Sequence, residues 1–348
     1  MSKTEINDYL SKCDEDLAKS VMYRVYGMPG PIFMEEDNDT PTPEPGPEPP
    51  TPPTPSYTTP FYVENITDED ETLTFTCYLD DLPITIETST DASNWDTLGT
   101  IGEGDSSELT AQLQPNNKLY IRATTDTWCK FVDSEGIPVG CTISGISKVG
   151  GNIMSLLYGS NFTGEETTFP SNSTHNFAGL FYSNYDLISA SELILPATTL
   201  TDSCYMHMFS NCSSLTTAPS LPATTLTDSC YMYMFYICSS LTTAPAILPA
   251  TTLADFCYQG MFCCTSLTTA PELPATTLAE ACYCDMFRDC DSLNYIKCLA
   301  TDISASNCTD NWLSHVAETG TFVKAASMTD WTTGNGIPEG WTVENATN

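Results

Sequence analysis

Cysteine is the residue type that could supply most chemistry in this chain, with 16 cysteines among 348 residues. Eight of them recur in two regular rows, and the two members within one repeat lie seven or eight residues apart. The rows are Cys204, Cys230, Cys257 and Cys282, and Cys212, Cys238, Cys264 and Cys290. This regularity favours small buried thiols that fill a repetitive interior. Disulfides between the rows remain an alternative for an oxidising compartment.

A zinc site is the second alternative for the cysteines. Its ligands would be Cys282, Cys284, Cys290 and Cys298. Their spacing, C-x-C-x5-C-x7-C, lacks the paired C-x2-C of common zinc domains. We therefore predict that the chain uses no metal and no other cofactor.

Residues for acid–base or nucleophilic catalysis are sparse. The chain has three histidines, His175, His207 and His315, and contains no H-E-x-x-H, G-x-S-x-G, Walker or Rossmann motif. An acidic pair, Glu165-Glu166, is present, but nothing places two carboxylates across a groove, as glycoside hydrolysis requires. The sequence therefore predicts a protein that is not an enzyme, with a glycan-degrading enzyme as the less favoured alternative.

Binding residues are better candidates than catalytic ones. Between repeats, some positions vary in residue type while their neighbours stay fixed, which is typical of the exposed positions through which repeat proteins bind partners. Aromatic side chains there suit sugar faces, and Arg and Asp suit polar groups. The candidate ligand-binding residues are His207, Tyr233, Tyr236, Asp285, Arg288 and Asp289. We expect His207 to be a surface residue rather than a catalytic base.

These positions belong to an internal repeat. The phrase LPATTL begins at Leu195, Leu221, Leu248 and Leu273, at intervals of 26, 27 and 25 residues, and each copy leads into Cys-Tyr-x-x-Met-Phe. An earlier, degenerate copy begins at Phe177. A fixed period near 26 predicts stacked units that align equivalent residues into ladders, because one unit cannot close a core alone.

The repeat resembles the BspA-type leucine-rich repeat, also described as the bacterial surface protein 26-residue repeat. The matching consensus here is L-P-A-T-T-L-x-x-x-C-Y-x-x-M-F-x-x-C-x-S-L-T-T-A-P. The entry segment 151–159 and the closing stretches 294–308 and 336–341 also look like that family. The resemblance implies a leucine-rich-repeat solenoid and a role in adhesion or recognition without catalysis. Its members occur on gut bacteria and in phages that infect them.

Other regions complete a mixed, β-rich fold class. Short apolar runs between turn signals predict a small immunoglobulin-like β-sandwich over residues 60–148. Cys77, Trp95 and Cys129 follow the Cys…Trp…Cys order of that fold, but cytoplasmic synthesis disfavours a Cys77–Cys129 disulfide. We expect the solenoid over residues 149–299 and a C-terminal cap over residues 300–348, with a short helix near residues 309–317 and strands at residues 321–323 and 341–343.

An N-terminal helix over residues 1–30 and an acidic, Pro-rich linker over residues 31–59 are expected to precede these domains. Nine of the fifteen residues from Pro41 to Pro55 are Pro, which predicts an extended spacer. An apolar stripe on the helix predicts an anchoring or oligomerising segment, and possible homo-oligomers, through residues 2–24. The stripe is formed by Ile6, Leu10, Cys13, Leu17 and Val21.

Charge restricts the partners further. With 11 Lys and Arg against 45 Asp and Glu, the formal net charge is −34, which argues against nucleic-acid binding. It also disfavours anionic membranes, and no apolar stretch approaches the ~20 residues of a membrane span. No secretory signal is apparent either. We therefore expect synthesis in a host cytoplasm and no membrane insertion.

The anchor, spacer and repeat together predict a phage virion-attached fibre or decoration protein. Its N-terminus would bind other virion proteins, and its solenoid would bind a host cell-surface glycan or protein. A bacterial cell-surface adhesin with the same repeat domain is the alternative.

Overall fold

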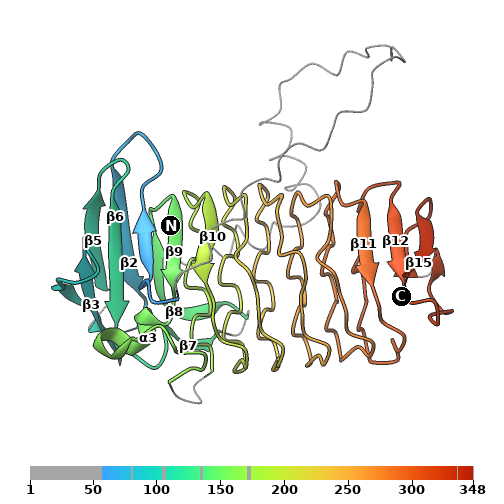
Figure 1. Cartoon of the computed structure of the whole chain (residues 1–348), viewed down its shortest axis with the longest axis horizontal. Coiled ribbons are helices and arrows are strands. Elements are labelled where there is room, and N and C mark those ends of the chain that lie inside the picture. The colour runs from blue at the N-terminus through green and yellow to red at the C-terminus, as the bar shows by residue number, and fades with distance from the viewer. Residues whose placement is uncertain are drawn as a thin grey trace, which may run out of the picture. The chain divides into compact units, whose positions relative to one another are not determined.

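The computed structural model describes residues 57–79, 81–103, 107–133, 136–170, 174–334 and 336–347. These residues belong to one compact unit (Figure 1). The predicted N-terminal helix, its five anchoring residues and most of the linker lie outside the described residues. Within the described part, no helix is long and apolar enough to cross a membrane.

Two sheets occupy the first part of the unit, which we call the β region (residues 57–152). A six-stranded sheet has the order β10-β9-β1-β6-β3-β4, and a four-stranded sheet has the order β5-β2-β8-β7. The strands are β1 (Tyr62–Glu64), β2 (Glu71–Cys77), β3 (Asp81–Ser89), β4 (Asp96–Glu103), β5 (Ser107–Leu113), β6 (Lys118–Ala123), β7 (Cys129–Val132), β8 (Pro138–Ser144), β9 (Lys148–Asn152) and β10 (Ser189–Ile194).

Side chains alternate between buried and partly exposed along β2, as expected for a strand with one face on the core. In β2, Leu73, Phe75 and Cys77 are fully buried, while the threonines between them are partly exposed. Cys77 lies opposite Cys141 of β8, and the two form a disulfide. The Cys77–Cys129 pairing that the immunoglobulin order suggested therefore does not form, because Cys129 lies on β7 and keeps a free, buried thiol.

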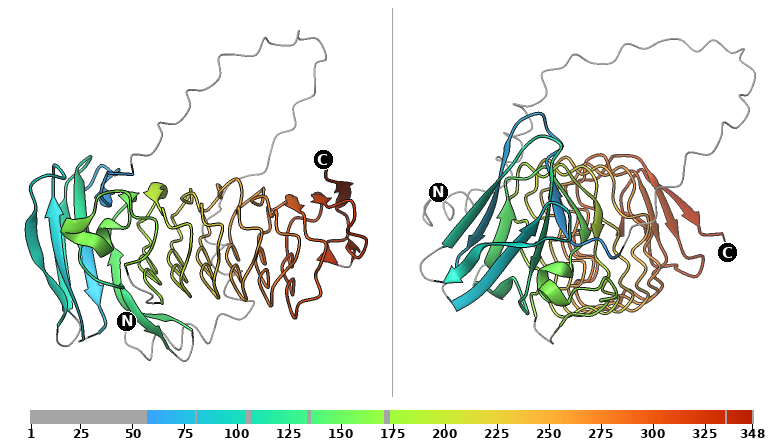
Figure 2. Two further views of the ribbon diagram at one scale, coloured as in Figure 1. Left: turned by 60° about the horizontal axis from the view of Figure 1, so that its bottom comes forward. Right: turned by 60° about the vertical axis from the view of Figure 1, so that its left-hand side comes forward.

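A second pattern begins after α3 (Ser155–Tyr158) and η1 (Gly159–Asn161). Six stretches that we call turn segments lie side by side along the chain after η1 (Figure 2). They are residues 175–184, 203–212, 229–238, 256–265, 281–290 and 307–315. We call residues 175–315 the repeat stack.

Backbone hydrogen bonds alternate in direction along each turn segment. In the second segment, Tyr205 N–H donates to Cys230 of the following copy, whereas Met206 N–H donates back to Ser203. Every second residue thus closes a local turn, and the residues between join neighbouring copies. Satisfying the N–H groups in this way removes the need for strands or helices there.

Aromatic ladders fill the interior of the repeat stack. Successive Phe rings stack with centroids 5.2–5.7 Å apart. This first ladder is formed by Phe181, Phe209, Phe235, Phe262 and Phe287. A second ladder stacks with centroids 5.6–6.2 Å apart. It is formed by Phe177, Tyr205, Tyr231, Tyr258, Tyr283 and Trp312. Identical side chains therefore provide most of the core, as the fixed positions of the repeat predict.

Outside the turn segments, the copies are joined by single parallel bridges. Thr217 bridges Ser189 and Thr243, and Thr225 bridges Thr199 and Thr252. Threonine pairs project outward near these bridges, and Thr242 and Thr268 are exposed. Each of these bridges is isolated and too short to make a strand, so no sheet runs along this side of the described repeats.

The C-terminal part closes the unit with β11 (Tyr295–Cys298), β12 (Thr321–Lys324) and β15 (Thr342–Asn345) in one parallel sheet. A further pair consists of β13 (Thr332–Thr333) and β14 (Gly336–Ile337). The predicted helix near residues 309–317 is wrong. Asp285 N–H donates to Asp310, and Phe287 N–H donates to Trp312, so these residues continue the turn pattern by one more copy.

The predicted fold class is therefore wrong. The described strands form several small separate sheets, none of them closed, and none continues through the repeats as the sheet of a solenoid would. Helix is confined, within the described residues, to Ser155–Asn161. The β region is not an independent sandwich either, because β10 pairs with β9 and one hydrophobic core runs from β2 to the C-terminal sheet.

Candidate functional site

The backbone of the turn segments arranges the variable residues in columns. Each segment has three residues in the left-handed conformation, four positions apart. The first column of interest contains His207, Tyr233, Gly260 and Asp285, with φ between 53° and 57°. The second contains Asn211, Ile237, Cys264, Asp289 and His315, with φ between 57° and 64°. The residues just before the second column are Tyr182, Ser210, Tyr236, Cys263 and Arg288.

These three columns make one surface, which we call the turn face. All six predicted ligand-binding residues lie on it: His207, Tyr233, Tyr236, Asp285, Arg288 and Asp289. The structure therefore brings together residues that are up to 82 positions apart in the sequence. They form two adjoining groups on this surface, one aromatic and one charged.

The aromatic group begins at Tyr182 and ends over a glycine. His207 stacks on Tyr233 with centroids 5.0 Å apart, and Tyr182 meets His207 edge-on at 6.2 Å. Tyr236 meets Tyr233 edge-on at 5.3 Å. A Cβ atom at Gly260 would lie 2.2 Å from Cε1 of Tyr233, so only glycine at this position leaves room for the ring.

His207 is only partly exposed on the turn face. Its Nδ1 is buried and has no hydrogen-bond partner. Desolvation lowers the pKa of His207 to about 4, so the imidazole is neutral near pH 7. Because Tyr182 and Tyr233 both contact the ring, the side chain supports the aromatic group.

The charged group lies next to the aromatic group. Arg288 Nη1 lies 3.4 Å from Asp285 Oδ1, and its Nε lies 3.1 Å from Asp289 Oδ2. His315 Nδ1 lies 2.7 Å from Asp289 Oδ1. Burial and then the charge of Asp285 raise the pKa of Tyr233 to about 12.

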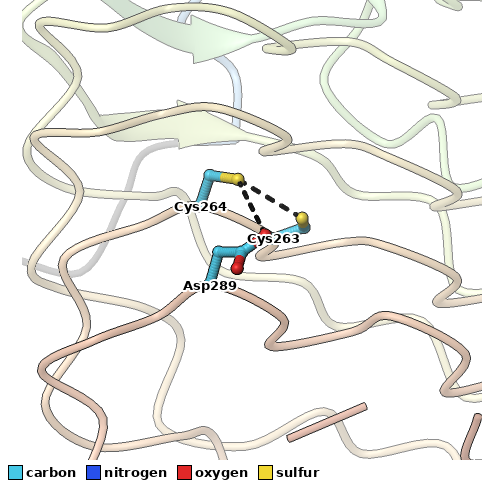
Figure 3. A group of neighbouring side chains, drawn as sticks. All are labelled: Cys263, Cys264 and Asp289. Atoms are coloured by element: carbon cyan, nitrogen blue, oxygen red, sulfur yellow. Dashed lines mark hydrogen bonds between the residues drawn. The ribbon is translucent and has the colours of Figure 1, made fainter. Parts of the chain in front are cut away.

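Cys264 departs from its predicted row and lies beside Cys263 on the turn face (Figure 3). The sequence places Cys264 in the second cysteine row, but it lies in the second left-handed column. Thr265 takes the row position instead: it is buried, and its Oγ1 is 3.3 Å from Sγ of Cys290. One residue is missing between Phe262 and Leu267, which shifts the assignment by one position.

The sulfur atoms of Cys263 and Cys264 are 3.5 Å apart, and Cys264 Sγ is 3.9 Å from Asp289 Oδ2. The hydrogen bond with Cys263 lowers the pKa of Cys264. Sequence reasoning missed this group. Cys263, Cys264 and Asp289 are the one group of three His, Cys, Asp or Glu side chains, among the described residues, whose possible metal-binding atoms lie within 4.8 Å of one another. The set Cys282, Cys284, Cys290 and Cys298, which the sequence suggests for zinc, is not brought together in this way.

A hollow of about 330 Å³ in the β region is a further candidate that the sequence does not indicate. Trp95, Tyr120 and Arg122 line it, together with residues near Pro60 and Phe162. The Arg122 guanidinium lies 4.3 Å above the Trp95 ring and pairs with Glu87. Because Arg122 is already neutralised by Glu87, the hollow offers mainly aromatic and hydroxyl surface.

Comparisons with family models, curated proteins and solved structures gave no match to this chain.

Proposed function

We propose that the chain is a non-catalytic binding protein of a phage virion, which is attached through its N-terminal residues and binds a host-surface glycan through the turn face. The resemblance of the repeat to BspA-type sequences supports an adhesive role. The apolar stripe within residues 2–24 and the Pro-rich spacer support attachment at the N-terminus.

One observation carries the binding part of the proposal. The turn face places aromatic rings beside an Arg–Asp group at positions where the backbone is the same in every copy. Aromatic rings pack against the apolar faces of sugars, and charged side chains form hydrogen bonds with hydroxyl groups at their edges. The side chains at these positions therefore vary without altering the scaffold.

The binding test uses the full chain and a panel of immobilised bacterial surface polysaccharides. We expect Tyr236→Ala and Arg288→Ala each to weaken binding at least about tenfold, equivalent to about 1.4 kcal/mol. Thr242→Ala and Thr268→Ala, on exposed positions outside the turn segments, serve as matched controls and should bind like the parent. Loss of binding in the Thr variants with unchanged binding in the turn-face variants would contradict the proposal.

The attachment test compares phage particles that carry the full chain with particles made with a chain lacking residues 2–24. We expect the truncated chain to be absent from purified particles. If it remains with them, the N-terminal residues are not the anchor.

A further inference from the structure

The second left-handed column changes character near the end of the repeat stack. In earlier copies it holds Asn211 and Ile237, and in the next three copies it holds Cys264, Asp289 and His315. Their backbone is joined directly, because Cys264 N–H donates to Arg288 and Asp289 N–H donates to Ser314. The turn itself does not require these residue types, since Asn and Ile adopt the same conformation in the earlier copies.

Neither Cys263 nor Cys264 fills the buried row of thiols. The buried row that the other thiols fill is occupied in this copy by Thr265. Cys263 instead occupies the position of Tyr236 and Arg288 in the neighbouring copies, and its side chain is buried while that of Arg288 is exposed. The row of buried thiols therefore does not explain why two adjacent thiols stand at variable positions beside a carboxylate from the next copy.

We propose that Cys263, Cys264 and Asp289 bind a thiophilic divalent cation of the zinc class. In a tetrahedral site with Zn–S of about 2.3 Å and Zn–O of about 2.0 Å, neighbouring sulfurs lie about 3.8 Å apart, and sulfur and oxygen about 3.5 Å apart. The corresponding distances here are 3.5 and 3.9 Å. All three donor atoms lie within 4.8 Å of one another, so small rotations bring them to one ion.

His315 supports the same group from the following copy. Its Nδ1 is 2.7 Å from Asp289 Oδ1, the oxygen that does not face Cys264. A histidine in this place orients the carboxylate or becomes a fourth ligand after rotating, and its side chain is 69% exposed and free to do so. Thiolate, carboxylate and imidazole are together the donors that zinc-class ions prefer.

Arg288 carries a positive charge beside the proposed cation site, so the proposal predicts in which direction its removal changes the metal affinity. Its Nε is 3.1 Å from Asp289 Oδ2, so it competes with a metal ion for that oxygen. The arginine side chain is 45% exposed and can turn away into solvent. Removing it should therefore strengthen metal binding, whereas removing any of the three donors should weaken it.

The test adds Co²⁺ or Zn²⁺ to the reduced full chain without any glycan, so its outcome is independent of the proposed function. We expect one Co²⁺ per chain, with a thiolate-to-cobalt charge-transfer band and the visible bands of tetrahedral cobalt. Cys264→Ser should lower the affinity at least about 100-fold and His315→Ala about 10-fold, while Arg288→Ala should raise it. Competition with Zn²⁺ then gives the affinity for zinc.

Cys284→Ser is the matched control, because Cys284 is also a half-buried thiol at a variable position but lies outside the donor set. It should bind cobalt like the parent, and circular dichroism should show that each variant is folded. Two results would overturn the proposal. One is cobalt binding that persists in Cys264→Ser, and the other is a reduced, folded parent chain that binds no Co²⁺.

Discussion

The β region and the repeat stack reach a buried core by opposite routes. In the β region, β2 pairs with β5 and β8, and the disulfide joins residues 64 positions apart. In the repeat stack, backbone bonds and ring contacts join each copy to the copy before or after it. A residue of the stack can thus be compared with its equivalents a few ångströms away, and a departure such as Cys264 becomes visible. The β region offers no such internal reference.

Stability should differ accordingly. Repeat arrays behave approximately as a sum of units and their interfaces, whereas a sheet with distant pairings loses stability as a whole. A substitution in the repeat stack should therefore act mainly on neighbouring copies, and one in the β region should act on both of its sheets.

Phe235→Ala should cost about 3–5 kcal/mol of unfolding free energy, because its fully buried ring stacks on both Phe209 and Phe262. Hydrogen exchange should become faster in the adjoining turn segments while β2 and β8 keep their protection. Phe75→Ala, a matched change in β2, should instead affect both sheets of the β region. A uniform loss of protection in Phe235→Ala would show that the stack unfolds as one unit.

Replacing Cys77 and Cys141 together with Ala should lower the unfolding free energy by about 4 kcal/mol, because the disulfide joins residues 64 positions apart. Denaturant unfolding of the parent chain should show the same loss after reduction. Cys284→Ser should leave stability almost unchanged. If reduction of the disulfide destabilises the repeat stack more than the β region, the prediction that the two regions respond separately is wrong.

His207 should make the repeat stack sensitive to acid. The folded pKa of about 4 lies below the ordinary value of 6.5, so the unfolded chain binds the proton more readily. The stabilisation is complete above about pH 6.5 and falls as the pH decreases toward 4, by at most about 3 kcal/mol.

His207→Tyr, which copies the residue of the next repeat, should remove this part of the pH dependence. The measurement is unfolding free energy against pH for both chains, and their difference cancels the titration of the carboxylates. Parallel curves for the two chains would mean that His207 is hydrated.

The smallest effect is expected from removing a hydroxyl group. Tyr231→Phe should leave stability unchanged or raise it by about 1 kcal/mol, because the buried hydroxyl has no partner and Phe177 already occupies the same ladder. Tyr62→Phe in β1 should lower it by about 1 kcal/mol, since that hydroxyl donates to Glu192. Equal changes in the thermal unfolding temperature of Tyr231→Phe and Tyr62→Phe would show that the two hydroxyl groups do not differ in this way.

The sequence predicts some parts of this architecture well and others poorly. The fixed Phe and Tyr positions indicate the ladders directly, because one period relates every member. Short apolar runs at residues 73–79, 119–123 and 321–323 predict strands close to β2, β6 and β12. The pattern misses β4, because DTLGTIGE contains two glycines and few apolar residues. The solenoid sheet is wrongly predicted because the turn segments satisfy their N–H groups without strands.

The candidate site shows the same division. Comparing the copies places all six candidate residues on one face, since a shared backbone makes equivalent positions neighbours. It does not show that the His207 ring is half-buried and meets Tyr182, because Tyr182 belongs to a degenerate copy. It also assigns Cys264 to the wrong row, because a single deleted residue leaves two equally good alignments, and only the burial of Thr265 decides between them.

The left-handed columns have a consequence for how this surface can change over generations. The left-handed conformation costs an L-residue roughly 1–2 kcal/mol, less for Asn and Asp and more for β-branched residues. Exchanging Tyr233 for another large side chain therefore leaves the backbone cost as it was and alters only what the side chain meets. Side chains of the turn face can consequently be substituted one at a time, while the aromatic ladders behind them stay in register.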